Sequence, residues 1–551
     1  MTQQFPQTQH AIQFVGANEV VYNTAKPMDE LGPRQILLRT EAVGICFSDT
    51  KLLKAFATHP RKGEVLGGLT PDELAEIPSY RPGDQPAVPG HEPVGRIVAI
   101  GSAVEHHQVG ERVLIQTDYR HLPTAGSNAA FGYNFEGALQ EYVVVDERVV
   151  MDPETGERFL IPVAEEPSKS AIALIEPWAC VEAAYAWGER QHVRDGGQLL
   201  VVVDSGREPL GLADVMAAHR PAQTTVVGEA AGLPGDAVTA ELADLGAATY
   251  DDIIYFGSHP DTIAQLGPLL AMGGIVNLVL AGTPIGAPVP VDVGRVHYDL
   301  IRYVGTLGDS AVDAYARIPA QCEIRAQDAV AIVGAAGPMG LMHAVRTAVS
   351  GVPGVRMDAV DVDDARLAHL EAVVAPIAVT NGVPASFRNS ATAPLEPGYS
   401  YVAVMVPAPA LLAQAVDIAG ENAIVNAFAG FAIGTMAELD LDAVAGRGVY
   451  LVGTSGSRIE DMKAMLAKVE AGTLDTNVSL WAVTGMPGVA EAIDSVTNRT
   501  SGGKILVYPQ LHELGLTRLE DLPAALPAVA ALMEDGRWTK AAEEELLRGQ
   551  K

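Results

Sequence analysis

Val333-Gly334-Ala335-Ala336-Gly337-Pro338-Met339-Gly340 is the stretch that decides the fold of this 551-residue chain. Apolar residues lead into it and a helical segment follows, so it predicts a tight turn from a strand into a helix. Glycines let the backbone approach a bound group closely, and the N–H groups at a helix start attract anions. We therefore expect an α/β fold with a parallel sheet, in which this turn holds a dinucleotide pyrophosphate.

The alternation of strands and helices around this turn occurs twice. From about residue 195, apolar strands alternate with alanine-rich helical stretches, as in βαβ units. Val304-Gly305-Thr306 returns as Val452-Gly453-Thr454, 148 residues later (452 − 304). Ile275-Val276-Asn277 returns as Ile424-Val425-Asn426, 149 residues later (424 − 275). A repeat of this length that occurs twice indicates a duplicated domain.

The glycine-rich turn differs between the two copies. The first copy reads Val203-Asp204-Ser205-Gly206-Arg207-Glu208-Pro209-Leu210-Gly211, which places Glu208 opposite Gly337. A carboxylate there adds bulk and negative charge, so we expect the first copy to bind a dinucleotide poorly. Asp361, at a strand end of the second copy, can accept hydrogen bonds from ribose hydroxyls and repels a 2'-phosphate, which predicts NAD over NADP. Glu229 is a candidate for the same place in the first copy, so the acid alone does not separate the copies.

Three fragments nearer the N-terminus carry residues of the types that bind metal. They are Gly44-Ile45-Cys46-Phe47-Ser48-Asp49, Gly90-His91-Glu92-Pro93-Val94-Gly95 and Leu174-Ile175-Glu176-Pro177. A thiolate, an imidazole and carboxylates are the ligands of a catalytic zinc ion that keeps one position open. We expect Cys46 and His91 to be ligands, with Glu92 and Glu176 as rivals for the third protein position.

Each of these side chains also has a simpler interpretation. Glu92 can orient a ligand instead of binding the ion, and Glu176 can serve only as an acid at a helix N-terminus. Ser48 is expected to relay a proton, although a turn serine that caps the next helix fits as well. Asp49 is expected to orient a ligand rather than to act as a base.

Composition limits the classes of partner and compartment. The formal net charge of −31 disfavours nucleic acid and anionic membrane surfaces. Cys46, Cys180 and Cys322 cannot form a disulfide framework, which fits the reducing cytoplasm. The first residues lack the basic start and apolar stretch of a secretory signal. The longest uncharged run, roughly 269–291, contains several glycines and prolines and is expected to form strand, loop and strand, not a membrane span.

The flanking regions differ in character from the repeat. Residues from about 10 to 165 contain short β-rich segments with turns between them, which favours a barrel-like domain. Between residues 51 and 90 lies a long polar excursion, expected beside the metal site. Its cations are expected to be solvated surface charges, with recognition of a substrate phosphate as the alternative: Lys51, Lys54, Arg61 and Lys62. Residues 519–547 at the C-terminus have a helical sequence pattern and are expected to form helices that dock on the protein.

These motifs, together with Val109-Gly110-Glu111-Arg112-Val113, resemble the zinc-dependent medium-chain dehydrogenase/reductase family, whose members include the alcohol dehydrogenases. Ile175-Glu176-Pro177 is similar to the sorbitol dehydrogenase branch. The stretch from Glu176 to Cys180, with Val452-Gly453-Thr454-Ser455-Gly456 and Ser501-Gly502-Gly503-Lys504, looks most like the sorbose-1-phosphate reductase group. The extra βαβ copy and the missing four-cysteine structural lobe depart from the family pattern.

The resemblance implies a GroES-like β-rich catalytic domain in residues 1–192, completed by 497–551. Two tandem Rossmann-like doubly wound domains would follow, a degenerate one in 193–322 and an NAD-binding one in 323–496. It implies one catalytic zinc, no structural zinc, and interconversion of a secondary alcohol and a ketone on a polyol, sugar or sugar phosphate. A homodimer or homotetramer is expected.

The expected site residues fall into three groups. They are Ser48, Cys46, His91 and Glu92 for catalysis; Gly334, Ala335, Gly337, Pro338, Met339, Gly340 and Asp361 for the cofactor; and Cys46, His91, Glu92 and Glu176 for the metal. Two other functions stay open on the sequence. One is a redox-neutral lyase or epimerase that retains NAD, and the other is a non-catalytic nucleotide-binding sensor or scaffold.

Overall fold

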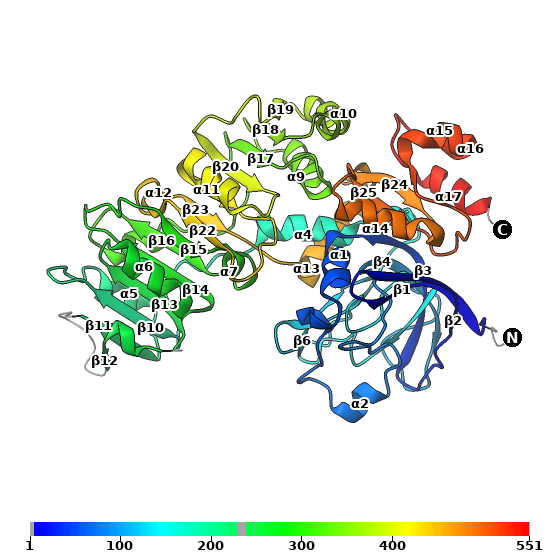
Figure 1. Ribbon diagram of the computed structural model, residues 1–551, viewed down its shortest axis with the longest axis horizontal. Coiled ribbons are helices and arrows are strands. Elements are labelled where there is room, and N and C mark those ends of the chain that lie inside the picture. The colour runs from blue at the N-terminus through cyan, green and yellow to red at the C-terminus, as the bar shows by residue number, and fades with distance from the viewer. Residues whose placement is uncertain (1–4, 229–237, 247, 550–551) are drawn as a thin grey trace. The chain divides into compact units, whose positions relative to one another are not determined.

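A computed structural model describes residues 5–228, 238–246 and 248–549 (Figure 1). The chain forms two compact units: Met1–Glu182 together with Gly456–Lys551, and Ala183–Ser455. Glu229, the acidic candidate of the first copy, lies outside the described residues.

The first unit is built on an eight-stranded sheet in the order β26-β24-β25-β3-β4-β5-β9, with β8 also paired to β3. Its strands are β3 Gln35–Ile45, β4 Glu92–Ile100, β5 Arg112–Ile115, β8 Tyr142–Asp146, β9 Leu160–Pro162, β24 Leu480–Thr484, β25 Lys504–Val507 and β26 Thr517–Arg518. Two antiparallel pairs accompany it: β1 Thr8–Gly16 with β2 Glu19–Pro27, and β6 Asp118–Pro123 with β7 Asn128–Ala130. This unit is α/β with a β-rich sheet, as expected.

Both ends of the chain contribute to this sheet. β25 pairs antiparallel with β3, so that Ile505 lies opposite Ile45. The neighbouring residue Lys504 is thereby placed beside the end of β3. The helices of this unit are α1 Phe47–Ala55, α2 Pro71–Ala75, α3 Lys169–Ala173, α13 Ile459–Glu470, α14 Val489–Thr497, α15 Leu522–Ala525, α16 Pro527–Ala530 and α17 Lys540–Arg548; α4 Ile175–Ala186 begins here.

The second unit contains two six-stranded parallel sheets with the same topology. The first has the order β12-β11-β10-β13-β14-β16 and the second the order β19-β18-β17-β20-β21-β23. The strands of the first sheet are β12 Val238–Ala240, β11 Gln223–Val227, β10 Gln198–Val203, β13 Tyr250–Phe256, β14 Leu270–Val279 and β16 Arg302–Thr306. The corresponding strands of the second sheet are β19 Ala385–Asn389, β18 Arg356–Asp361, β17 Ala329–Val333, β20 Tyr399–Val404, β21 Ala419–Asn426 and β23 Tyr450–Val452. The duplicated Rossmann-like fold predicted from the sequence repeat is confirmed.

The helices that follow the first strand of each copy differ in where they begin. In the second copy, β17 ends at Val333, and α9 Pro338–Ala348 starts after four intervening residues, with Pro338 in its first turn. In the first copy, β10 ends at Val203 and α5 Leu212–Ala218 starts only after Gly211. The first-copy helix therefore starts further from the end of its strand and is shorter, with 7 residues against 11. The other helices of the unit are α6 Pro260–Leu266, α7 Val293–Tyr298, α8 Ala311–Tyr315, α10 Asp364–Thr380, α11 Pro409–Ile418 and α12 Leu441–Arg447.

The long uncharged run forms a strand, a loop and a strand, as predicted. It contains β14 and then β15 Val289–Asp292, which pairs antiparallel with β22 Met436–Leu439. Among the described residues, we find no helix with the length and apolar character needed to cross a bilayer.

The expectation of solvated cations between residues 51 and 90 is wrong for Lys62. This side chain is only 1% exposed, and its ammonium donates to the carbonyl oxygens of Arg81 and, at 2.9 Å, Gln85. Burial lowers the pKa of Lys62 to about 8. The lysine thus holds a loop together because it satisfies backbone carbonyls that burial would otherwise leave unpaired.

Candidate metal centre and cofactor turn

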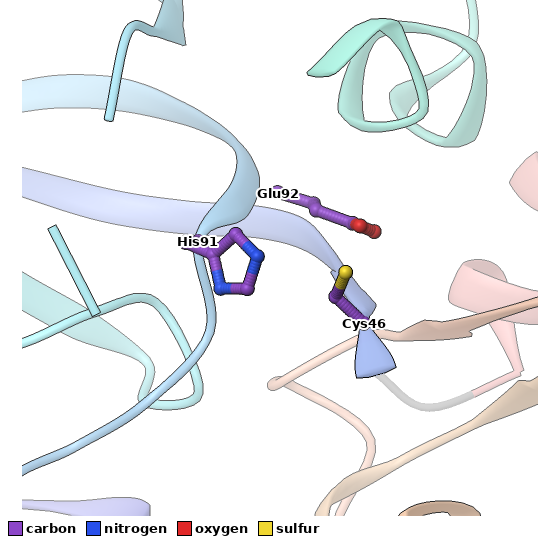
Figure 2. Close-up of side chains that lie close together, drawn as sticks. All are labelled: Cys46, His91 and Glu92. Atoms are coloured by element: carbon purple, nitrogen blue, oxygen red, sulfur yellow. The ribbon is translucent and has the colours of Figure 1, made fainter. Parts of the chain in front are cut away.

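Cys46, His91 and Glu92 lie together in the first unit (Figure 2). One potential ligand atom from each of the three lies within 4.8 Å of the other two. His91 is 6% exposed and Glu92 is fully buried, so both are shielded from bulk water. The structure thus brings together three of the four residues predicted as metal ligands, and their role as ligands stays a prediction.

Two neighbouring strands position these donors. Cys46 directly follows β3 and precedes α1, while Glu92 is the first residue of β4. In the antiparallel β3–β4 pair, Gly44 lies opposite Glu92. A Cβ atom on Gly44 would lie 2.1 Å from Oε2 of Glu92. A side chain at position 44 would therefore displace the Glu92 carboxylate from the position it occupies.

Lys504 is a member of this site that the sequence analysis did not predict. Its Nζ donates to Oε1 of Glu92 at 2.6 Å and to the carbonyl oxygen of Ile45 at 2.9 Å. The side chain is 3% exposed, and although burial disfavours its charge, Glu92 and Cys46 raise the pKa of Lys504 above its usual value. A charged residue at the start of the strand-like run Lys504-Ile505-Leu506-Val507 was the available signal.

Asp49 and Ser48 contact opposite sides of the His91 ring. Oδ1 of Asp49 lies 3.2 Å from Nδ1 of His91, and Oδ2 accepts from the Cys46 N–H at 2.9 Å. The Ser48 hydroxyl lies 3.0 Å from Nε2 of His91 and 3.0 Å from Sγ of Cys46. With Nδ1 donating to the carboxylate, Nε2 carries the lone pair and faces the same side as the thiol.

A row of aromatic rings extends from His91 through Tyr133 to His59, which belongs to the polar excursion. The Tyr133 ring centroid lies 5.5 Å from that of His91 and 5.1 Å from that of His59. Burial raises the pKa of Tyr133, and the charge of Arg61 partly offsets this rise. Burial, followed by the charges of Arg61 and Lys51, lowers the pKa of His59 to about 4. Neither Tyr133 nor His59 was predicted from the sequence.

Glu176 lies near this group but is not one of the three clustered donors. It stands in the first turn of α4 and is 9% exposed. Burial and the charge of Glu92 raise its pKa to about 7, against the opposing effects of His91 and Lys504. The Cys180 thiol, one helical turn later, lies 3.7 Å from Oε1 of Glu176.

The clustered donors suit a zinc ion for two reasons: their ligand types, and a buried Glu92 oxygen that has no hydrogen-bond partner. A thiolate, an imidazole and a carboxylate oxygen are the ligand types of catalytic zinc sites. Oε1 of Glu92 is paired with Lys504, whereas Oε2 is buried with no hydrogen-bond partner. A buried carboxylate oxygen without a partner is costly, and a cation beside it removes that cost.

A second group of metal-binding residue types lies in the first sheet domain: His192, Asp195 and His219. The two imidazole rings are stacked at 3.7 Å between centroids and are inclined by only 7°. A metal ion lies close to the plane of each imidazole that binds it, so one ion cannot suit both parallel rings as they stand. We therefore assign no metal to this group.

The predicted cofactor turn has the space that a pyrophosphate needs. A Cβ atom on Gly337 would meet no other atom within 4 Å, so this glycine leaves an open position at the start of α9. At Gly334 a Cβ atom would lie 2.3 Å from Val406, and at Gly340 one would lie 2.4 Å from the Ala335 carbonyl. The turn is thus closely packed at Gly334 and Gly340, and it is open at Gly337, where the first N–H groups of α9 are available to an anion.

Asp361 lies at the end of β18 beside this turn. Its Oδ2 accepts from the Ala336 N–H at 3.1 Å, which ties the carboxylate to the glycine-rich turn. Its Oδ1 forms an ion pair with Arg366 at 3.0 Å. This arginine was not part of the predicted site, and it offsets some of the negative charge that would repel a phosphate.

The corresponding turn of the first copy is organised differently. The Asp204 carboxylate accepts from the Tyr255 hydroxyl at 2.7 Å, and Glu208 is exposed in the loop before α5. Because α5 has only 7 residues and starts after Gly211, no long helix presents its N-terminus to this loop. The first copy thus lacks the helix start that the second copy presents at its turn, and its weaker binding of a dinucleotide stays a prediction.

Comparison with known proteins agrees with these observations. Residues 32–154 match the alcohol dehydrogenase GroES-like domain family. An uncharacterized protein of Escherichia coli, YggP, is 24% identical over 329 residues, which cover 52% of this chain and 71% of YggP. L-Sorbose 1-phosphate reductase of Klebsiella pneumoniae is 23% identical over 351 residues, which cover 57% of this chain and 78% of the reductase.

A solved structure shares the fold. The 2R,3R-butanediol dehydrogenase of Bacillus subtilis superposes with a TM-score of 0.51 at 15% identity, covering 91% of this chain and all of the dehydrogenase. Residues 32–154 thus carry an alcohol dehydrogenase GroES-like domain, and the chain is similar to the zinc alcohol dehydrogenase-like proteins of the medium-chain dehydrogenase/reductase family, with distant similarity to sorbitol dehydrogenase and sorbose 1-phosphate reductase.

Proposed function

We propose that this protein is a zinc-dependent, NAD-linked oxidoreductase that interconverts a secondary alcohol and a ketone on a polyol, sugar or sugar phosphate. The observation that carries the proposal is the cluster of half-buried Cys46 with buried His91 and Glu92, in which one oxygen of Glu92 has no hydrogen-bond partner. When bound, zinc supplies Lewis-acid polarisation of the substrate oxygen, and NAD supplies the acceptor for the hydride. The polyol or sugar class is suggested by the names of the distant relatives.

Cys46, His91 and Glu92 would hold the metal, with Glu176 as the alternative third carboxylate. Asp49 keeps the His91 ring in the orientation that presents Nε2 to the ion. Lys504 holds one oxygen of Glu92 and leaves the other available.

Ser48 is the residue proposed to move the proton. Its hydroxyl lies 3.0 Å from both the Cys46 sulfur and Nε2 of His91, so it lies where a substrate hydroxyl would approach the clustered donors. From there it can accept the proton of the alcohol and donate its own onward. Tyr133 contributes an aromatic wall beside His91, with the two ring centroids 5.5 Å apart.

The cofactor is proposed to bind the second copy only. Three observations support this proposal: Gly337 leaves the start of α9 open, α9 is long enough to present its N-terminal N–H groups, and the Asp361 carboxylate, proposed to accept from ribose hydroxyls, is tied to the turn through Ala336. The carboxylate favours NAD, while the ion pair with Arg366 reduces its repulsion of a 2'-phosphate, so NADP is included in the test.

A substrate panel tests the proposal. Purified protein is assayed with polyols, sugars and sugar phosphates in the presence of NAD or NADP, and reduced cofactor is followed by absorbance. Wild type should carry about one catalytic zinc per chain and should reduce NAD with at least one polyol-type alcohol. Cys46→Ala should lose the zinc and the activity, whereas Cys322→Ala, a buried cysteine of the other unit, should keep both.

The other outcomes separate the rival functions. Full activity in metal-free Cys46→Ala would remove zinc from the mechanism. Turnover of substrate with tightly held NAD and no net reduced cofactor would indicate the redox-neutral reaction. Nucleotide binding without any turnover would indicate a sensor or scaffold.

A further inference from the structure

The two sheet domains of the second unit face each other through a pseudo-two-fold contact. β15 comes from the first copy and β22 from the second, and they pair antiparallel (Figure 1). Val289 pairs with Leu439 and Val291 pairs with Ala437. Shifting by the repeat length of 148 makes Ala437 the counterpart of Val289 and Leu439 the counterpart of Val291. Each position therefore pairs with the counterpart of the other, as in a symmetric interface between identical subunits.

Close backbone approaches repeat the same symmetry. A Cβ atom on Gly305 of the first copy would lie 3.0 Å from Cβ of Ala445 in the second. A Cβ atom on Gly453, the counterpart of Gly305, would lie 2.9 Å from Cα of His297, the counterpart of Ala445. Both glycines of the repeated Val-Gly-Thr motif are thus explained by contact with the other copy.

Hydrogen bonds from backbone N–H groups to aspartate side chains across the contact are nearly symmetric as well. The N–H of Gly286 donates to Asp442 at 2.8 Å, and the N–H of Gly434, the counterpart of Gly286, donates to Asp292 at 2.9 Å. Each of these acids stands at the N-terminal end of a helix of the opposite copy, α12 and α7. The helices approach the edge strands, so that α12 contacts β16 and α7 contacts β23.

The contact is buried like a protein core. One continuous apolar cluster contains residues of both copies, among them Val291, Val296, Leu439 and Val444, all at most 3% exposed. An interface this apolar is typical of permanent association, not of two domains that move independently. It also covers β16 and β23, the edge strands through which each sheet could otherwise pair with another chain.

We propose that the first sheet domain serves as a built-in partner for the second. It occupies, within one chain, the surface by which two single-copy chains would form a symmetric dimer. Its altered turn at Glu208 fits this role, because a partner domain does not need to bind the cofactor. The full chain is consequently a monomer of 57.8 kDa with one cofactor site, in contrast to the homodimer or homotetramer expected from the family resemblance.

Sedimentation equilibrium of the full chain at micromolar concentration tests the proposal without any cofactor or substrate. We expect a single species of 57.8 kDa at all concentrations. A stable species of twice that mass or more would overturn the proposal, and it would do so whether or not the protein is an NAD-linked enzyme.

Matched variants then test whether the internal contact is responsible. Gly305→Val and Gly453→Val both insert side chains into the contact, whereas a Cβ on Gly188 of the same unit meets no atom within 4 Å. We expect both interface variants to melt earlier and to self-associate with rising concentration, and Gly188→Val to behave as wild type. Equal melting of all three variants, with no self-association, would contradict the proposal.

Discussion

Lys504→Met should destabilise the first unit strongly, and more so without metal than with it. Lys504 and Glu92 are both buried, and they are joined by a 2.6 Å hydrogen bond; the same ammonium also donates to the Ile45 carbonyl. Removing one partner of a buried ion pair leaves an uncompensated charge and typically costs about 3–5 kcal/mol. If zinc occupies the free side of the Glu92 carboxylate, the ion compensates part of that charge, so the loss in the zinc-loaded protein should be smaller.

Urea unfolding monitored by tryptophan fluorescence measures this effect. Three of the four tryptophans, Trp178, Trp481 and Trp538, belong to the first unit, so the signal mainly reports the unit that contains the pair. The measurement is made with a chelator and again with added zinc. Lys468→Met is the matched control, because Lys468 forms an exposed ion pair with Glu182 whose loss should cost about 0–1 kcal/mol.

A double variant identifies the cause. Lys504→Met combined with Glu92→Gln removes both charges, so much of the stability lost in Lys504→Met should return in the metal-free protein. If metal-free Lys504→Met lies within about 1 kcal/mol of wild type, the same as the exposed control, the Lys504–Glu92 pair is not the buried, coupled pair described above.

Three further predictions concern other parts of the molecule. Gly44→Ala should lower zinc content measured by mass spectrometry, because its Cβ would lie 2.1 Å from Oε2 of Glu92, whereas Gly67→Ala, with its nearest contact at 3.5 Å, should retain the metal. Gly337→Glu should weaken NAD binding at least 10-fold in calorimetry with little change in melting temperature, since no atom lies within 4 Å of that position; unchanged affinity would argue against the cofactor turn. Burial lowers the pKa of Lys62 from 10.5 to about 8. The cost of burying its positive charge therefore reduces the free energy of unfolding in full below pH 8. That cost is relieved between pH 8 and 10.5, because the folded protein loses the proton there while the unfolded chain keeps it. Wild type should therefore gain up to about 3 kcal/mol of stability across that interval relative to Lys62→Met, and parallel stability curves would refute the burial of a titrating lysine.

The features that the sequence predicted are those carried by local pattern or by repetition. The glycine-rich turn and the 148-residue repeat correctly indicated two parallel sheets of one topology, because strand and helix periodicity survive in each copy. Cys46 and His91 could be paired from their motifs, although nothing in the spacing fixed their separation. The choice between Glu92 and Glu176 stays a proposal.

The residues that sequence reasoning missed depend on long-range contacts. Lys504 lies 412 residues from Glu92, and no local pattern links a lysine in a strand to that carboxylate. Lys62 looked like a surface charge because it lies in a polar, proline-containing segment, yet it is buried by the loop whose carbonyls it contacts. The pairing of β15 with β22 likewise needed the packing of two domains that each look complete in sequence.

The pairing of β25 with β3 has a consequence for biosynthesis. The second unit is continuous in the chain, but the first unit requires residues from both sides of it. At about 5–20 residues per second, the 412 residues between Glu92 and Lys504 take roughly 20–80 s to translate. During that interval the nascent Glu92 carboxylate lacks Lys504, so the later sheet domains can fold on the ribosome before the candidate metal centre is complete.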